Sequence, residues 1–300
     1  MNIKSKKRSI IYIASLILFI IYLIYANDVI ILLSGSAKLE KTEISSLIIN
    51  TDAYQAIGFS KAYENMAEDF ACNGWAFCET ADLNSDKKIS IIFRGSNDSY
   101  IAPAKLTSFQ LKSVFPELTV KGDNNGFGTQ FSTLNMKNGI YELLIYDWEN
   151  DYSSGLARTG RKYIKDNKGL REYTPGQVKN IDDTNKSDNV WFAIAPTQAD
   201  GNVILDGWAY VNNHSTLFQN VYLEFKNNDG EIQTYDTISY ERPDVSQNFK
   251  NQKYFSSGFK VTIPQEKLKN STCTVIIEDA GTFQKATYSV HYDPATNKIS

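Results

Sequence analysis

Hydrophobic residues follow two patterns along this chain, one continuous run near the N-terminus and many short alternating segments after it. The run has no charge from Ile10 to Ala26, and as a helix its 17 residues rise roughly 25 Å, close to the thickness of a bilayer core. Asn27 and Asp28 interrupt it before apolar residues 29–33 extend it. Four basic residues precede the run: Lys4, Lys6, Lys7 and Arg8.

This asymmetry of charge predicts the orientation of the N-terminal segment. Basic residues favour the cytoplasmic side of a membrane, and no basic residue follows the run until Lys38. Residues 1–37 are therefore expected to form a cytoplasmic stub and a transmembrane signal anchor. The chain would then be a single-pass protein of the plasma membrane with its C-terminal part extracytoplasmic. A cleaved signal peptide is the alternative, although its apolar region would be unusually long.

The second half of the chain carries the alternation typical of β-strands. Val221, Leu223 and Phe225 alternate with two polar positions, the period of a half-buried strand, and Asp229-Gly230 favours a hairpin turn. The pattern predicts seven strands, near 190–196, 202–211, 219–226, 231–239, 258–263, 272–279 and 284–292. Seven strands in about 100 residues, without a long helix, predict an immunoglobulin-like β-sandwich.

Comparison of the chain with itself reveals an internal duplication. Four blocks recur in the same order at a shift of 132 or 133 residues: 73–77 with 206–210, 89–93 with 221–225, 126–127 with 258–259, and 136–147 with 268–279. Both copies contain Gly-Trp-Ala, with the tryptophans at Trp75 and Trp208. We expect these two rings to fill the core of each sandwich, with sugar stacking as the alternative.

The duplication divides the chain into four parts. Residues 1–37 are the anchor, 38–165 the first sandwich, 166–189 a linker rich in small and polar residues, and 190–300 the second sandwich. The fold class is thus mainly β, one transmembrane helix followed by two tandem immunoglobulin-like β-sandwiches. An insertion near 52–70 is predicted as a short helix capped by Asp52, with its apolar residues at Tyr54, Ile57, Phe59, Met66 and Phe70.

Composition narrows the class of protein further. The 300 residues are 42% hydrophobic, which excludes wholesale disorder, and the net charge of −3 argues against nucleic acid as a partner. Cys72 and Cys78 lie six residues apart on one predicted strand, about 20 Å, too far for a disulfide. We expect three buried thiols that pack as small hydrophobic residues, with a bond from Cys273 to Cys72 or Cys78 as the alternative.

Two groups of residues are candidates for ligand binding. Pro243 favours an extended Arg242, and Asp244 then begins a helical turn with Val245 and Phe249 on one face. Arg242 and Asp244 either brace this turn or bind a polar ligand. The second group has Trp148 and Tyr152 interleaved with three acids that we expect in an exposed loop, Asp147, Glu149 and Asp151. Aromatic rings beside acids are typical of sugar binding, and a carboxylate pair is also what glycoside hydrolysis requires.

Other chemistry finds little support in the sequence. His214 and His291 have no companion at metal-ligand spacing, and no nucleophile elbow, P-loop or dinucleotide glycine pattern is present. The start of a calcium loop at 82–86 lacks the glycine and glutamate that such a loop needs, because Lys87 and Phe93 stand in their places. We therefore predict no catalytic residue, no cofactor and no metal.

The ordered elements of the second copy resemble a known type of domain. Gly-Trp-Ala at 207–209, Arg-Pro-Asp-Val at 242–245 and Ser-Gly-Phe at 257–259 resemble immunoglobulin-like β-sandwich domains of membrane-anchored cell-surface proteins from Firmicutes. The first copy keeps Gly-Trp-Ala and Gly-Phe but lacks Arg-Pro-Asp-Val. The resemblance implies a setting near wall polymers or glycosyltransferases and transfers no catalytic residue.

These observations favour a binding protein over an enzyme. The first hypothesis is a membrane-anchored extracytoplasmic protein that recognises a cell-wall glycopolymer or a wall-assembly partner. A structural spacer or a subunit of a membrane complex is the second, with a membrane protein as its partner. A carbohydrate-active enzyme is the third, and it would need two carboxylates facing one cleft.

Overall fold

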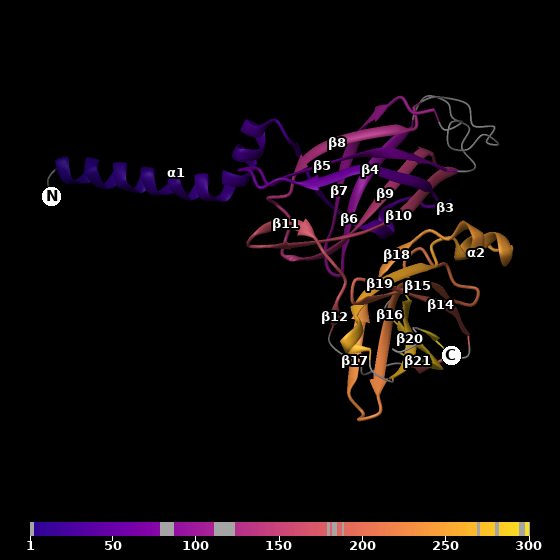
Figure 1. Ribbon diagram of the computed structural model, residues 1–300. Coiled ribbons are helices and arrows are strands. Elements are labelled where there is room, and N and C mark those ends of the chain that lie inside the picture. The colour runs from indigo at the N-terminus through magenta and orange to yellow at the C-terminus, as the bar shows by residue number, and fades with distance from the viewer. Residues whose placement is uncertain are drawn as a thin grey trace.

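The computed structural model describes residues 3–78, 87–110, 124–178, 181, 185–187, 189–268, 271–279, 282–293 and 298–299. The protein is mainly β, with large antiparallel sheets. A long helix, α1 (Ile3–Ser34), extends away from two β-rich bodies that lie one against the other (Figure 1). The prediction of a mainly β protein is confirmed.

Helix α1 contains the apolar run. No single helix among the described residues is long and apolar enough to cross a membrane, whereas stretches 13–21 and 25–34, bent by 59°, meet that requirement together. The end of α1 is tied to the first β body, because Asp28 forms an ion pair of 2.8 Å with Lys38 and a hydrogen bond with Asn135. Leu32 and Leu33 remain about 80% exposed beside this attachment.

The first body, residues 37–166, has two layers of strands. One layer contains β4 (Tyr54–Ala62), β5 (Asp69–Phe77) and β8 (Gly126–Ser132), and the other contains β6 (Lys88–Gly95), β9 (Gly139–Asn150) and β10 (Ser153–Asp166). Strand β7 (Ser99–Thr107) joins the layers, since 99–104 pair with β6 and 105–107 with β8. Short strands β1 (Ala37–Lys38) and β2 (Glu40–Thr42) pair with β8 and β7. Phe70, Phe93 and Phe131 are fully buried in the core.

The second body repeats this arrangement. One layer is β14 (Val190–Ala199), β15 (Asn202–Val211), β19 (Gly258–Pro264) and β18 (Ile238–Tyr240), and the other is β17 (Ile232–Asp236), β16 (Asn220–Asn227), β20 (Ser271–Asp279) and β21 (Thr282–Asp293), with β22 (Lys298–Ile299) at the edge. All seven predicted strands are present. The strand predicted over 231–239 is divided at Thr237, so that β17 and β18 lie in different layers.

The two copies agree in strand order and largely in register. Gly74 pairs with Phe127 in the first copy, as Gly207 pairs with Phe259 in the second. One block departs from the sequence alignment: Ile91 faces Ile145, whereas the strand partner of Ile277 is Val221. This places β6 two residues away from the 132-residue shift. A two-residue step keeps each side chain on its original face of the sheet, so the core tolerates it.

Two predictions about local structure are wrong. Residues 52–70 are not a helix, because β3 (Thr51–Asp52) pairs with β10 and β4 pairs with β5 over its length. Pairing of β3 with the distant β10, and of β4 with the following strand β5, overrides the local helical spacing of the apolar residues. The segment 166–189 is not a free linker either. Its described parts include β11 (Gly169–Glu172) on β10, β12 (Gln177–Val178) on β17 and β13 (Asn185–Lys186) on β21.

The repeated tryptophans lie outside the sandwich cores, which corrects our expectation. Along β15 the even positions point outward, so Trp208 and Tyr210 pack beneath the short helix α2 (Pro243–Asn248) and the turn η3 (Gln252–Tyr254). Trp75 stacks on Phe109 with ring centroids 5.9 Å apart. The adjacent Gly207 is the inward residue, because the ring of Phe259 occupies its place in the core.

The open question about the cysteines is answered in favour of free thiols. Cys72 and Cys78 are buried in the first core and Cys273 in the second, and all three are free. Burial raises the pKa of the Cys72 and Cys273 thiols to about 12. They pack as small apolar residues and stay protonated at neutral pH.

Candidate ligand-binding cleft between the two domains

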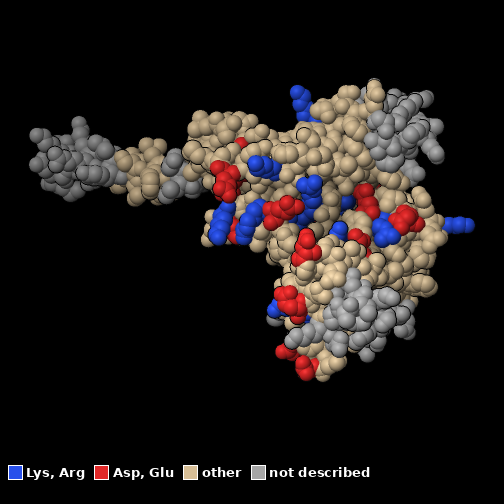
Figure 2. Space-filling model, in the orientation of Figure 1, with Lys and Arg blue, Asp and Glu red and all other residues tan. Residues whose placement is uncertain are grey.

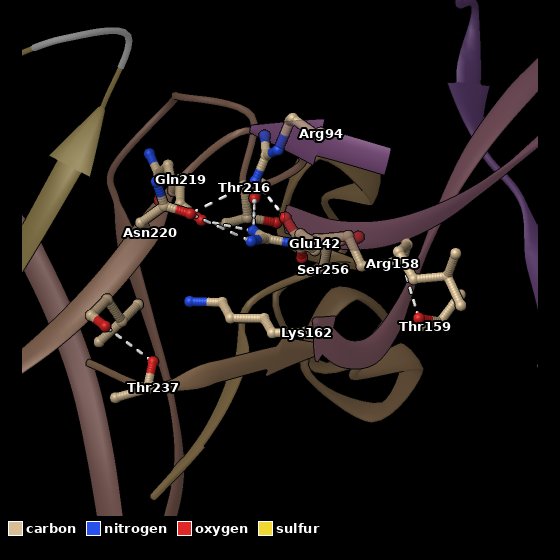
Figure 3. A network of polar contacts seen from close by, with 12 residues as sticks. Arg94, Glu142, Arg158, Thr159, Lys162, Thr216, Gln219, Asn220, Thr237 and Ser256 are labelled. Atoms are coloured by element: carbon tan, nitrogen blue, oxygen red, sulfur yellow. Dashed lines mark hydrogen bonds and ion pairs between the residues drawn. The ribbon is translucent and has the colours of Figure 1, made fainter. Parts of the chain in front are cut away.

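A buried guanidinium fixes the two bodies, here called domains, to each other. Arg158 on β10 has no exposed side-chain surface, and its Nε donates to Glu142 Oε1 at 2.7 Å within the first domain. Its Nη1 donates across the boundary to the carbonyl oxygens of Thr216 and Gln219 (Figure 3). A short backbone pairing of Thr159 with Tyr240 joins the domains beside it.

Glu142 balances two arginines at this boundary. One carboxylate oxygen of Glu142 accepts a hydrogen bond from Arg158, and the other accepts one from Arg94 of β6. Burial alone would raise the pKa of Glu142, but the positive charges of Arg158 and Arg94 outweigh it and lower the pKa to about 2. The carboxylate is therefore ionised in the folded protein. Its contribution to stability is present above the ordinary glutamate pKa and is lost as the pH falls towards 2.

A cleft of about 680 Å³ opens beside this ion cluster. It is lined from the first domain by Arg94, Gly95, Ser96, Gly139, Ile140, Glu142 and Lys162, from the intervening segment by Tyr173 and Val178, and from the second domain by Asn220, Tyr222, Asp236 and Glu278. Acidic and basic side chains gather along the boundary of the two domains on the face seen in Figure 2. The cleft therefore has a polar, charged wall on both sides.

The polar groups of the cleft hold one another in place. Lys162 contacts both carboxylate oxygens of Asp236 at 2.8 Å across the boundary. Asn220 accepts from Arg94 at 3.3 Å and donates to Glu278 at 3.0 Å, and the hydroxyl of Tyr222 donates to Glu278 at 3.1 Å. Such a fixed set of amide, hydroxyl and charged groups with phenol rings suits a polyhydroxylated ligand, because little ordering is needed on binding.

The predicted pair Arg242 and Asp244 lies away from this cleft. The two side chains form a bidentate pair, Nε to Oδ1 at 2.7 Å and Nη2 to Oδ2 at 2.6 Å. The hydrogen bonds from Arg242 lower the pKa of Asp244. Behind the pair, Val245 and Phe249 of α2 and its C-terminal cap pack against the cluster around Tyr210. The predicted helical turn is present, but it begins at Pro243 with Arg242 as its N-cap, so the expected cap by Asp244 is wrong. This geometry agrees with the bracing role.

Of the two predicted aromatic residues, Trp148 is packed against the protein and Tyr152 is exposed. Trp148 is partly buried, with Lys88 Nζ 4.6 Å from the centre of its ring. Tyr152 is 91% exposed in the turn between β9 and β10. Neither residue lines the cleft. Both predicted pairs therefore remain hypotheses for other surfaces.

The acids near Trp148 are not the exposed loop acids that we predicted. Asp147 and Glu149 lie within β9 with their side chains buried, and Lys87 Nζ is 3.0 Å from Asp147 and 3.5 Å from Glu149. Burial raises the pKa of Asp147 despite this ammonium. Asp151 alone is exposed in the turn. These buried acids and the lysine form an ion cluster, so neither carboxylate is exposed to solvent as a sugar-binding acid would be.

The described residues offer no arrangement of metal ligands. None of their His, Cys, Asp and Glu side chains form a group of three that could hold a metal ion. His214 contacts Asp279 instead. The calcium-like segment 82–86 and the side chain of His291 lie outside the described residues.

A second acidic feature of the boundary is a pair of covered carboxyl groups. Asp52 on β3 is 6% exposed and accepts from Ser256 of the second domain at 3.1 Å. Glu241 lies close enough to feel its charge, and Glu241 Oε1 is enclosed without a hydrogen-bond partner among the described residues. Burial raises the pKa of Asp52 to about 7, against the hydrogen bond from Ser256 and the charge of Arg158. Burial, followed by the charge of Asp52, raises the pKa of Glu241 well above its usual range.

Asp52→Asn should remove a loss of stability that the natural protein suffers at alkaline pH. The pKa of Asp52 is higher in the folded than in the unfolded protein, so the folded protein holds this proton more tightly. The resulting contribution to folding stability is fully present below the unfolded pKa and is lost as the pH rises through about 7. A shift of this size corresponds to about 2–4 kcal/mol, so the variant should be more stable than the natural protein by that amount at pH 8 and equal to it near pH 4. Urea unfolding across this range measures the difference. The exposed Asp229→Asn is the control, and the same pH slope in all three proteins would contradict the prediction.

Sequence reasoning missed the residues that line the cleft. Glu142 immediately precedes the apolar run 143–145, and Arg158 is one of only six arginines in the chain. A charged residue next to an apolar run in a predicted strand is the sequence feature that could have indicated a buried ion pair. The partners could not be named from it, because they come from strands far apart in the sequence.

Comparison with known protein families finds no matching family model, and comparison with curated proteins finds no match. No site residue or activity is therefore transferred from a relative.

Proposed function

We propose that the protein is a membrane-anchored extracytoplasmic binding protein that recognises a cell-wall glycopolymer in the cleft between its two domains. The observation that carries the proposal is the cleft of about 680 Å³, in which amide, phenol and charged groups are held by hydrogen bonds before any ligand arrives. Sugar rings need many directed hydrogen bonds and aromatic surface, and this wall supplies both. The protein binds without performing chemistry.

The strand order supports the proposal that both domains are immunoglobulin-like. In each copy the first, second, fifth and fourth strands are neighbours, and the third pairs with the sixth. That is the arrangement of immunoglobulin-like sandwiches, in which the two layers exchange at the fourth strand. Such domains are widely used as binding modules, which agrees with the proposed role.

The N-terminal segment supports anchoring in a membrane. Its apolar side chains between residues 13 and 21 are about half exposed, and α1 extends away from both domains (Figure 1). A bilayer would cover this surface, and the basic residues before it favour a cytoplasmic N-terminus. The attachment of Asp28 to Lys38 would hold the domains near the membrane.

The full chain in lipid nanodiscs is the preparation that tests this function. Binding to a panel of purified wall polysaccharides and teichoic-type polymers is measured by biolayer interferometry. Ile140→Trp introduces a large ring at the 42%-exposed Ile140 in the cleft wall, and Ile232→Trp makes the same change at a 38%-exposed residue outside it. We expect saturable binding to one polymer, weakened at least tenfold by Ile140→Trp and unchanged by Ile232→Trp.

Two results would overturn the proposal. Equal binding by both tryptophan variants would exclude the cleft, and a loss confined to Tyr152→Ala or Arg242→Ala would transfer the site to the sequence-predicted residues. Binding to no polymer, by a protein that unfolds cooperatively, would exclude glycopolymer recognition. Co-purification with a membrane protein would then favour the spacer or complex subunit, a role for which the rigid domain boundary is equally suited.

A further inference from the structure

We infer that the cleft selects a glycan carrying a free protonated amine, such as a hexosamine without its N-acetyl group, and that Glu278 receives this amine. The inference rests on the proposed function, since it names the chemical class of ligand for the same cleft.

Each other carboxylate of the cleft has its own cation. Glu142 contacts two arginines, and Asp236 contacts Lys162. Glu278, at the end of β20, forms no ion pair with any described lysine or arginine. Of these three acids it alone is touched by no described cation, and the second arginine on Glu142 balances its charge without contacting it.

The hydrogen bonds of Glu278 leave one oxygen for a ligand. Asn220 Nδ2 and the hydroxyl of Tyr222 both donate to Oε2, at 3.0 and 3.1 Å. No group in the described part of the chain donates to Oε1. The two donors fix the carboxylate plane, so a third donor from the cleft meets a positioned acceptor. An ammonium group makes the stronger bond there, because charge-assisted hydrogen bonds are about twice as strong as neutral ones.

The phenols of the wall lie close to these carboxylates. Burial raises the pKa of Tyr222, the charges of Glu278 and Asp236 raise it further, and the charge of Arg94 opposes them. Burial and then the charge of Asp236 act in the same direction on Tyr173. A cation bound at Glu278 is attracted by that carboxylate and lies close to Tyr222, whose hydroxyl donates to the same group.

The experiment compares two matched probes on the full chain in nanodiscs. Glucosamine oligomers and N-acetylglucosamine oligomers of equal length are titrated calorimetrically at pH 6, where the free amine is protonated. We expect glucosamine oligomers to bind about tenfold more tightly. Glu278→Gln should reduce that ratio to about twofold or less, because the amide keeps an acceptor for Asn220 and Tyr222 but has no charge.

Controls separate the inference from general attraction and from the proposed function. Glu266→Gln removes an exposed acid outside the cleft, and it should leave the ratio unchanged. Equal affinity for the two oligomers, or equal losses in the two glutamine variants, would overturn the amine selection while leaving sugar recognition in place. Failure of both oligomers and of every wall polymer would overturn the proposed function as well. Unfolding curves of both variants confirm that the fold is retained.

Discussion

Arg158→Leu is expected to destabilise the protein by about 3–5 kcal/mol and to loosen the contact between its two domains. The guanidinium is fully buried, and leucine leaves the buried Glu142 with one cation instead of two. The carbonyl oxygens of Thr216 and Gln219 lose a donor in the same place. Most of the cost comes from leaving these groups without partners, since the net value of the intact ion pair is small.

Urea unfolding and limited proteolysis measure both effects of this substitution. Arg171→Leu is the matched control, because Arg171 also pairs with an acid, Asp166, but is 47% exposed. It should change stability by less than about 1 kcal/mol. If Arg158→Leu costs no more than Arg171→Leu, the buried boundary between the domains does not exist as described.

The strands of the second domain could be predicted from the sequence because their two faces have different surroundings. Val221, Leu223 and Phe225 face the core, and the residues between them lie on the opposite face of the sheet. The sequence therefore alternates between apolar and polar residues over this strand. The division of 231–239 into two strands carries no such sign. The apolar residues there, Ile232, Tyr235, Ile238 and Tyr240, keep no single alternating phase, and nothing in this short stretch shows that β17 and β18 belong to different layers.

The first domain shows where local patterns fail. Tyr54, Ile57 and Phe59 have a spacing that a helix accepts, but the segment forms β4 and pairs antiparallel with β5, the next strand along the chain. The stability of the strand comes from this pairing and from its packing, which a pattern read over a few residues does not contain. Asp52 illustrates the same limit, because a residue typical of helix caps is instead covered by the second domain.

The cleft escaped prediction for a related reason. Its wall joins Arg94, Lys162 and Glu278, which lie on three strands and in two domains. No spacing rule connects such residues, whereas Arg242 and Asp244 attracted notice because they are sequence neighbours. Sequence reasoning therefore selected a pair of neighbouring side chains and missed a site whose residues come together only in the folded chain.

The repeated glycines are the positions where the smallest change should have a large effect. A Cβ atom on Gly207 would lie 2.1 Å from the carbonyl oxygen of Ala193, and one on Gly74 would lie 2.1 Å from the carbonyl oxygen of Ala56. Both obstacles are backbone atoms of the paired edge strand, so no side chain can rotate away. Gly207→Ala and Gly74→Ala should each destabilise the protein by about 3 kcal/mol or more, since the strands must separate to admit the methyl group.

Chemical denaturation of the two variants measures this cost, and Gly128→Ala provides the control. Gly128 lies on β8 with no atom within 4 Å of its added Cβ, and it has no positive φ. Its alanine variant should remain within about 1 kcal/mol of the natural protein, because only chain entropy changes. Similar losses at Gly74 and Gly207 would show that the two copies use glycine for the same close approach. A tolerated alanine at either position would mean that its edge strand pairs differently, and the structural equivalence of the two domains would fail at that point.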